Sequence, residues 1–184
     1  SLERLIAAAP AALNPRGRIG FIQNAAALLR SGTVRGDQYL QILAGFANDE
    51  NPLVVSALAA SLTAVKNNFI TEPLEESFAA YVRRLLGPAL RRYGLDRAPG
   101  EPEAVSLVRP ALIGWLADEG RDEAVLARAE AMARSFLEDR GSIDPSMIGQ
   151  ALSLSAIRGD SALFEEYRTR FERATGADQH HQKA

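Results

Sequence analysis

The stretch EPEAVSLVRPALIGWLADEGRDEAVLARAEAMARSFL, residues 101–137, decides the fold. On both sides of Gly120-Arg121-Asp122, apolar residues recur three and four positions apart, among them Val108, Leu112 and Leu116 before it and Val125, Ala129 and Met132 after it. This period places apolar atoms on one face of an α-helix. We expect Gly120 to end the first helix in the left-handed conformation and Asp122 to cap the second. So short a connection predicts an antiparallel pair.

The same period runs through the rest of the chain, with helix stop and start signals between the apolar segments. A glycine followed within a few residues by an aspartate recurs at Gly32/Asp37, Gly120/Asp122 and Gly159/Asp160. Asn51-Pro52 and Asp144-Pro145 are further helix starts. We therefore predict an all-α fold of about nine helices, in which stacked antiparallel hairpins form a HEAT- or armadillo-like superhelix. A closed helical bundle is the alternative.

Prolines and short polar clusters predict where these helices are interrupted. We expect Pro10 to disrupt the first helix and Gly87-Pro88 to kink or break a later one. Pro110 predicts a bend near Ser106. The cluster at residues 14–17 predicts a turn, with the next helix starting at Arg18.

Composition is that of an ordinary globular chain. It has 184 residues, 47% of them hydrophobic and 24% charged, a net charge of −2 and no cysteine. The mixed charge argues against nucleic acid and anionic membrane surfaces as partners, and no apolar run reaches the roughly twenty residues of a membrane span. We predict one helical-repeat domain over residues 1–176 and a disordered tail over residues 177–184. The sequence does not fix the cell compartment.

Residue types that carry catalysis or hold metals are few. His180 and His181 are adjacent in the predicted tail and would make a poor chelate. The serines inside helices have no histidine nearby to activate them, and we expect them to be packing residues: Ser56, Ser61 and Ser153. We therefore predict no catalytic, cofactor-binding or metal-binding residues in this chain.

Other patterns also favour structural roles. Gly17-Arg18-Ile19-Gly20 follows no strand and is a weak match to a phosphate-binding loop. Neighbouring acids diverge on a helix, so we interpret three acidic pairs as solvated helix ends: Asp49-Glu50, Glu75-Glu76 and Asp118-Glu119. We interpret Arg83-Arg84 and Arg91-Arg92 as a solvated basic strip that balances nearby acids. Trp115 is expected in the core or half-buried between helices.

Four stretches, in this order and spacing, resemble a known family: RIGFIQNA at residues 18–25 with Leu28 to Gly32, Phe46 to Val55, Gly100 to Phe136, and AIRGD at residues 156–160 with Phe164. Together they resemble the C-terminal helical domain of the M1 family of zinc aminopeptidases. The chain departs from the family pattern at four positions: Asn24 replaces the usual Asp, Ser56 a large aromatic and Val108 a Leu, while Arg121 lies inside the Gly-Asp turn.

The resemblance implies a supporting role. The domain would pack on a catalytic domain of the same polypeptide and shape the chamber that controls peptide access. Zinc and the reacting groups would belong to that catalytic domain, since this chain has no His-Glu-x-x-His segment. The expected partners are therefore the catalytic domain and peptide substrates, and the chain alone is not expected to be an enzyme.

Two other classes of function stay open: a free-standing helical-repeat adaptor that binds a peptide or protein, and an α-helical enzyme of unknown type. If a catalytic domain covers one face, the isolated chain should expose an apolar patch and self-associate. Within residues 101–137, where the resemblance is strongest, we expect Arg109 to be a structural ion-pair partner.

Overall fold

The computed structural model describes residues 2–157, 159 and 161–170, and all regular structure in these residues is helical. The elements are α1 (Leu2–Ala12), α2 (Pro15–Arg30), α3 (Gly36–Ala44), α4 (Pro52–Phe69), the 3₁₀ helix η1 (Glu72–Leu74), α5 (Glu75–Tyr93), α6 (Glu103–Ala117), α7 (Glu123–Glu138) and α8 (Pro145–Ile157). Residues 161–170 are helical as well. The all-α prediction is confirmed. The predicted domain end at residue 176 and the predicted tail over residues 177–184 lie outside the described residues.

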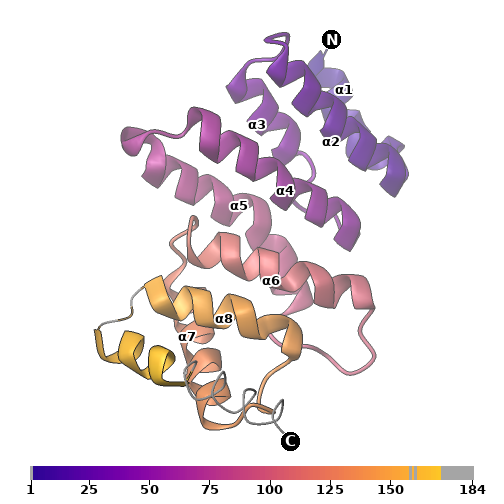
Figure 1. The fold of residues 1–184 in the computed structure, drawn as a ribbon. Coiled ribbons are helices and arrows are strands. Elements are labelled where there is room, and N and C mark those ends of the chain that lie inside the picture. The colour runs from indigo at the N-terminus through magenta and orange to yellow at the C-terminus, as the bar shows by residue number, and fades with distance from the viewer. Residues whose placement is uncertain (1, 158, 160, 171–184) are drawn as a thin grey trace, which may run out of the picture.

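Consecutive helices pack as antiparallel neighbours in two layers (Figure 1). In one layer α2 packs on α4, α4 on α6 and α6 on α8. In the other layer α3 packs on α5, but α5 and α7 have no comparable contact within the described residues. A stack whose members lie closer together on one side curves toward that side. The layer of α2, α4, α6 and α8 is therefore the inner layer.

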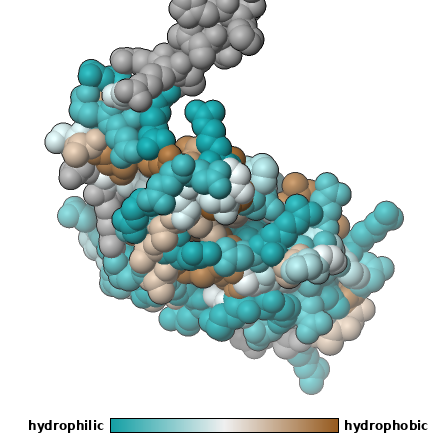
Figure 2. Space-filling model, turned by 90° about the horizontal axis from the view of Figure 1, so that it is seen from below, coloured by the Kyte–Doolittle hydropathy of each residue, from teal (hydrophilic) through white to brown (hydrophobic). Residues whose placement is uncertain are grey.

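One continuous apolar core runs between the two layers. Fully buried side chains come from successive helices, among them Leu43, Leu58, Leu62, Leu86, Leu112 and Ile113. Exposed large apolar side chains are distributed over separate elements: Leu28, Leu53, Phe69, Leu74, Leu107, Ile157 and Phe164. Seen from below, hydrophilic residues cover most of the surface and hydrophobic residues show between them (Figure 2).

Helix starts agree with the predicted capping residues at three places. Asn51 Oδ1 accepts from Leu53 N at 3.0 Å, and Asp144 Oδ1 accepts from Ser146 N at 2.8 Å. Asp122 Oδ1 accepts from Ala124 N and Val125 N at 3.1 and 3.2 Å. These bonds satisfy amides that have no partner inside the helix.

Two predicted helix starts are wrong. Asn14 Oδ1 accepts from Gly17 N at 2.9 Å, so α2 begins at Pro15 and not at Arg18. Arg35, not Asp37, occupies the cap position of α3. Asp37 lies in the first turn and accepts from Arg35 Nε at 2.9 Å.

The prolines do not break the helices that contain them. α1 continues past Pro10 to Ala12, and α5 continues past Pro88 to Tyr93. The predicted disruption at Pro10 and a break at Gly87-Pro88 are therefore wrong, while a kink at Gly87-Pro88 stays a prediction. A proline costs one backbone hydrogen bond and crowds the preceding turn. In α5 apolar residues are buried on both sides of Pro88, namely Leu85, Leu86, Ala89 and Leu90, and this burial outweighs the local cost.

The turn between α6 and α7 differs from its prediction. Arg121 has the positive φ, 49°, whereas Gly120 is not among the positive-φ glycines. The left-handed conformation of Arg121 turns the chain so that Asp122 N donates to Leu116 O at 2.9 Å. A Cβ atom at Gly120 would lie 2.6 Å from Leu116 O. Glycine is therefore required at position 120 for space and not for a left-handed conformation.

Candidate functional site

The described residues contain no cluster of three or more His, Asp or Glu side chains that could hold a metal ion. His180 and His181 lie outside them. Ser61 is half-buried, and its Oγ donates to Ala57 O at 2.8 Å. Ser56 and Ser153 are exposed, so the prediction that they are packing residues is wrong. Gly17 and Gly20 lie within α2 and form no loop. The absence of catalytic and metal-binding residues from the whole chain stays a prediction.

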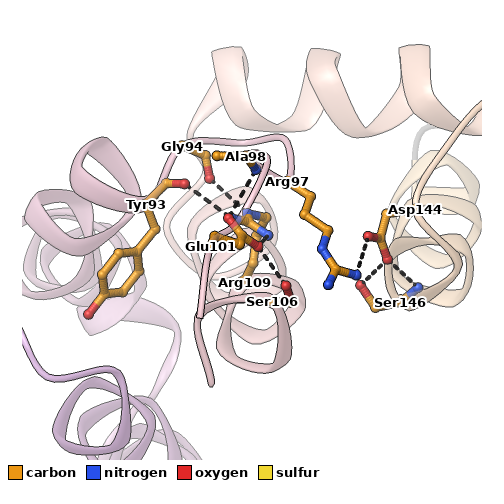
Figure 3. Close-up of polar contacts among 9 residues, drawn as sticks. All are labelled: Tyr93, Gly94, Arg97, Ala98, Glu101, Ser106, Arg109, Asp144 and Ser146. Atoms are coloured by element: carbon orange, nitrogen blue, oxygen red, sulfur yellow. Dashed lines mark hydrogen bonds and ion pairs between the residues drawn. The ribbon is translucent and has the colours of Figure 1, made fainter. Parts of the chain in front are cut away.

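A buried ion pair lies where the end of α5 and the connection after it meet α6 (Figure 3). Arg109, on α6, is 1% exposed. Its Nη1 donates to Glu101 Oε1 at 2.7 Å and its Nη2 to Glu101 Oε2 at 2.5 Å. Arg109 also donates to the carbonyl oxygens of Tyr93 and Gly94, both at 3.1 Å, where α5 ends. This bidentate pair holds the 94–102 connection and the end of α5 against α6.

Glu101 receives two further hydrogen bonds, from Ser106 Oγ at 2.5 Å and Ala98 N at 3.1 Å. The bonds from Arg109 and then from Ser106 lower the pKa of the Glu101 carboxyl to about 2. The carboxylate stays ionised at neutral pH and is a poor general acid or base. The predicted role of Arg109 as a structural ion-pair partner is confirmed.

A second buried carboxylate joins the first hairpins. Asp49 is 8% exposed, and its Oδ2 accepts from Arg18 Nη1 at 2.9 Å. Arg92 Nη1 donates to Asp49 O at 2.9 Å, and Tyr93 OH donates to Glu50 O at 3.0 Å. The interpretation of Asp49-Glu50 as a solvated helix end is therefore wrong for Asp49. Arg92 likewise binds backbone carbonyls and does not only face solvent.

Further arginines link the last hairpins at their connections. Arg97 Nη1 lies 3.4 Å from Asp144 Oδ2, and Arg128 Nη2 lies 2.7 Å from Asp96 Oδ1. Hydrogen bonds from Ser146 and then from Arg97 lower the pKa of the Asp144 carboxyl. The connections therefore carry polar contacts between hairpins, in addition to the apolar core between helices.

The other acidic pairs lie near the start of α5 and the end of α6. Arg121 Nη2 contacts Glu75 Oε2 at 2.6 Å, and Arg121 Nη1 contacts Glu76 Oε2 at 3.4 Å. Lys66 Nζ pairs with Glu119, whose hydrogen bond raises the pKa of the lysine. Glu75 and Glu76 are exposed, as predicted for solvated helix ends. Arg83 donates to Gly120 O and so helps to hold the turn between α6 and α7.

Trp115 is half-buried, as predicted, and its ring packs edge-on against Phe78 with centroids 6.5 Å apart. It lines a cavity of about 320 Å³ to which α4, α6 and α8 contribute Thr63, Asn67, Ala111, Gly114 and Gln150. Lys66, Asp118 and Glu119 line it as well. Sequence reasoning assigned Trp115 only to packing. The helical period shows which residues face outward, but not which outward residues of different helices meet.

A family model described as the ERAP1-like C-terminal domain matches residues 1–184. The chain belongs to this family. The predicted resemblance to the C-terminal helical domain of M1 aminopeptidases is therefore confirmed, and the helical stack is an ERAP1-like C-terminal domain. In the part of this domain that the structure describes, no helix has the length and apolar character needed to cross a bilayer. Its buried arginines and carboxylates contact the domain's own backbone and side chains.

Proposed function

We propose that this chain is the non-catalytic C-terminal helical domain of an M1-type zinc aminopeptidase. There it packs on the catalytic domain and shapes the chamber through which peptides reach the active site. The observation that carries the proposal is the family match over residues 1–184. Zinc and the reacting groups belong, in this proposal, to the catalytic domain.

The geometry supports a role as a surface that lines the peptide chamber rather than as a catalytic site. The curved stack offers an extended inner face along α2, α4, α6 and α8. The buried ion pair of Arg109 and Glu101 makes its contacts within the domain and holds the stack together. A rigid curved face suits a surface that limits which peptides enter, because its shape does not yield to the substrate.

The proposal is tested by comparing the 184-residue chain with the full-length polypeptide that contains it. We expect the complete polypeptide to contain a His-Glu-x-x-His segment, to bind zinc and to hydrolyse an aminoacyl-nitroanilide. We expect the chain alone neither to bind zinc nor to hydrolyse this substrate. Zinc-dependent turnover by the chain alone, or a complete polypeptide without any peptidase segment, would contradict the proposal.

The role in peptide access needs its own measurement. Deleting residues 1–184 from the complete enzyme should change the ratio of turnover of a long peptide to that of a small aminoacyl-nitroanilide, because only the long substrate reaches the chamber wall. The catalytic domain's zinc content serves as the control for folding. If the ratio of long-peptide turnover to nitroanilide turnover is unchanged, the domain has no role in peptide access.

The alternative is a free-standing adaptor that binds a peptide or protein on its inner face. The layered stack is compatible with an adaptor, because helical arrays commonly bind their partners on the concave surface. The same comparison separates the two functions, since an adaptor has no peptidase segment in its polypeptide.

A further inference from the structure

A cavity of about 260 Å³ lies between the 94–102 connection, α7 and the start of α8. None of the residues that line it belongs to α2, α4 or α6, so it is separate from the cavity beside Trp115. Its volume is below the usual range for ligand pockets, about 300–1,000 Å³. The size suits one small molecule of few atoms and not a peptide.

The floor of this cavity is apolar. Met132 of α7 is 4% exposed and Met147 of α8 is 3% exposed. Leu95 and Ile143 are half-buried and pack against the core beside them. Methionine side chains are flexible and polarisable, and they adapt to apolar groups of different shapes. A small apolar group that enters the cavity therefore leaves water for an apolar surface, which favours binding.

The rim of the cavity carries both signs of charge. Arg97 Nη1 lies 3.4 Å from Asp144 Oδ2 (Figure 3), and Arg128 Nη2 lies 2.7 Å from Asp96 Oδ1. The first distance is long for a charge-assisted hydrogen bond, which is typically about 2.7–2.9 Å. Both arginines are exposed, and exposed ion pairs contribute little to stability. A ligand can therefore take the place of these pairs at a small cost in free energy.

The chemistry of the rim restricts the ligand. A guanidinium group binds a carboxylate through two parallel hydrogen bonds, and a carboxylate accepts the protons of an ammonium group. With two cations and two anions on the rim, a ligand of one sign would meet as many like charges as opposite ones. A free α-amino acid carries both charges on one carbon atom. If its side chain is apolar, that side chain matches the floor.

We propose that this cavity binds a free α-amino acid with an apolar side chain. Arg97 and Arg128 bind its carboxylate, Asp96 and Asp144 bind its ammonium group, and its side chain packs on the methionines of the floor. The inference rests on the proposed function only for the source of the ligand, because an aminopeptidase releases free amino acids.

The two methionines make the test direct, because they are the only ones in the chain and both line this cavity. The 184-residue chain is labelled with ¹³C at the methionine methyl groups and titrated with L-leucine. We expect the signals of Met132 and Met147 to shift and to saturate, with a Kd of about 1 mM for so small a ligand.

Analogues of leucine test the need for both charges. Isocaproate has the carboxylate and the same branched chain but no ammonium group, and isoamylamine has the ammonium group but no carboxylate. Each should bind about tenfold more weakly than L-leucine or not at all, because half of the rim loses its counter-charge. L-Glutamate keeps both charges but should also bind about tenfold more weakly, since its side chain would place a charge on the apolar floor.

Matched variants locate the site. Arg128→Ala removes one partner of the carboxylate and should raise the Kd for L-leucine about tenfold. Arg134→Ala removes an exposed arginine from the same helix, outside this cavity, and should leave the Kd unchanged. Alanine favours helix at least as well as arginine, so both variants should keep the wild-type Tm. Comparison of Kd values, and not of signal positions, excludes a mere local effect of the substitution on Met132.

Three results would overturn the inference: no saturable shift of either methyl signal at ten times the expected Kd, binding of isocaproate or isoamylamine as tight as that of L-leucine, or equal Kd values for the two variants. The titration needs no catalytic domain, so it is independent of the zinc and turnover measurements. An active peptidase whose helical domain does not bind L-leucine would overturn this inference alone. Binding of L-leucine by a chain whose polypeptide holds no peptidase segment would overturn the proposed function alone.

Discussion

Arg109 is a long cation at a helix position that otherwise faces the apolar core. All the donors that it uses in the structure go to Glu101 or to the carbonyls that end α5. A buried charge is tolerated only when it is paired and hydrogen-bonded in this way. The pair therefore contributes mainly to the position of the 94–102 connection. Either charge without its partner would destabilise the fold.

Arg109→Ala should be strongly destabilising, because it leaves the Glu101 carboxylate without its partner. We expect the free energy of unfolding to fall by roughly 3 to 5 kcal/mol, measured by urea denaturation. The control is Arg128→Ala, which removes an exposed ion pair with Asp96 and should cost at most about 1 kcal/mol. Equal losses in the two variants would show that the buried pair has no special role.

Glu101 also predicts a pH dependence. Its folded-state pKa of about 2 lies below its ordinary value of 4.5, so the ionised form stabilises the fold. This stabilisation is complete above pH 4.5 and is lost as the pH falls from there toward 2. The gap in free energy of unfolding between wild type and Glu101→Gln should therefore narrow between pH 5 and pH 2.5, as followed by urea denaturation. A gap that is constant over this range would contradict the assignment.

At this scale the sequence predicted that Arg109 is paired, but not with which residue. The partner, Glu101, lies in a connection, and only the packing of α5 on α6 brings the two together. The same reason explains the wrong interpretation of Asp49. Its partners Arg18 and Arg92 are 31 and 43 positions away, beyond the reach of any local pattern.

At the scale of single elements, the turn between α6 and α7 shows that glycine serves two distinct purposes. Gly32, Gly94 and Gly100 have positive φ, whereas Gly120 provides room beside the Leu116 carbonyl. The sequence predicted where helices meet because caps and breakers act locally. It did not predict that Arg121 would take the left-handed conformation, because that depends on the close approach of Gly120 to the Leu116 carbonyl. It also did not predict that α5 would continue through Pro88, because the burial of the neighbouring apolar residues decided this.

Gly120→Ala should destabilise the protein by about 1 to 3 kcal/mol, since the added methyl group overlaps the Leu116 carbonyl and forces the turn to shift. The control is Gly20→Ala, within α2, where a Cβ atom meets nothing within 4 Å. That change should stabilise by about 0.5 to 1 kcal/mol, because alanine is the better helix former. Thermal denaturation of both variants checks the prediction, and a Gly120→Ala variant as stable as wild type would refute it.

At the scale of the whole molecule, each inner-layer helix from α2 to α8 packs on the next, whereas α5 and α7 of the outer layer have no comparable contact in the part of the chain that the structure describes. Family membership and the class of fold followed from the order and spacing of helical patterns along the sequence. The curvature and the meeting of three helices around Trp115 did not, since periodicity identifies the buried face of each helix but not the angle between helices.

The isolated chain should self-associate, because proposed contacts with a catalytic domain are missing and large apolar side chains are exposed. Leu107, 69% exposed on α6, and Leu53, 58% exposed on α4, both lie on the inner layer. We expect the weight-average mass from light scattering to rise with concentration, and Leu53→Asn with Leu107→Asn to reduce that rise. Leu74→Asn, in η1 and away from this layer, is the control. A monodisperse monomer at high concentration would contradict the prediction.

The pairing of each helix with its nearest neighbours also has a consequence for how the chain acquires its structure. Contacts join helices that are close in sequence, so few distant segments must meet before the fold becomes stable. Such arrays fold by adding one hairpin to the next. During synthesis, α2 to α4 can therefore form a first folded unit, onto which α5 and α6 and then α7 and α8 dock as they emerge from the ribosome.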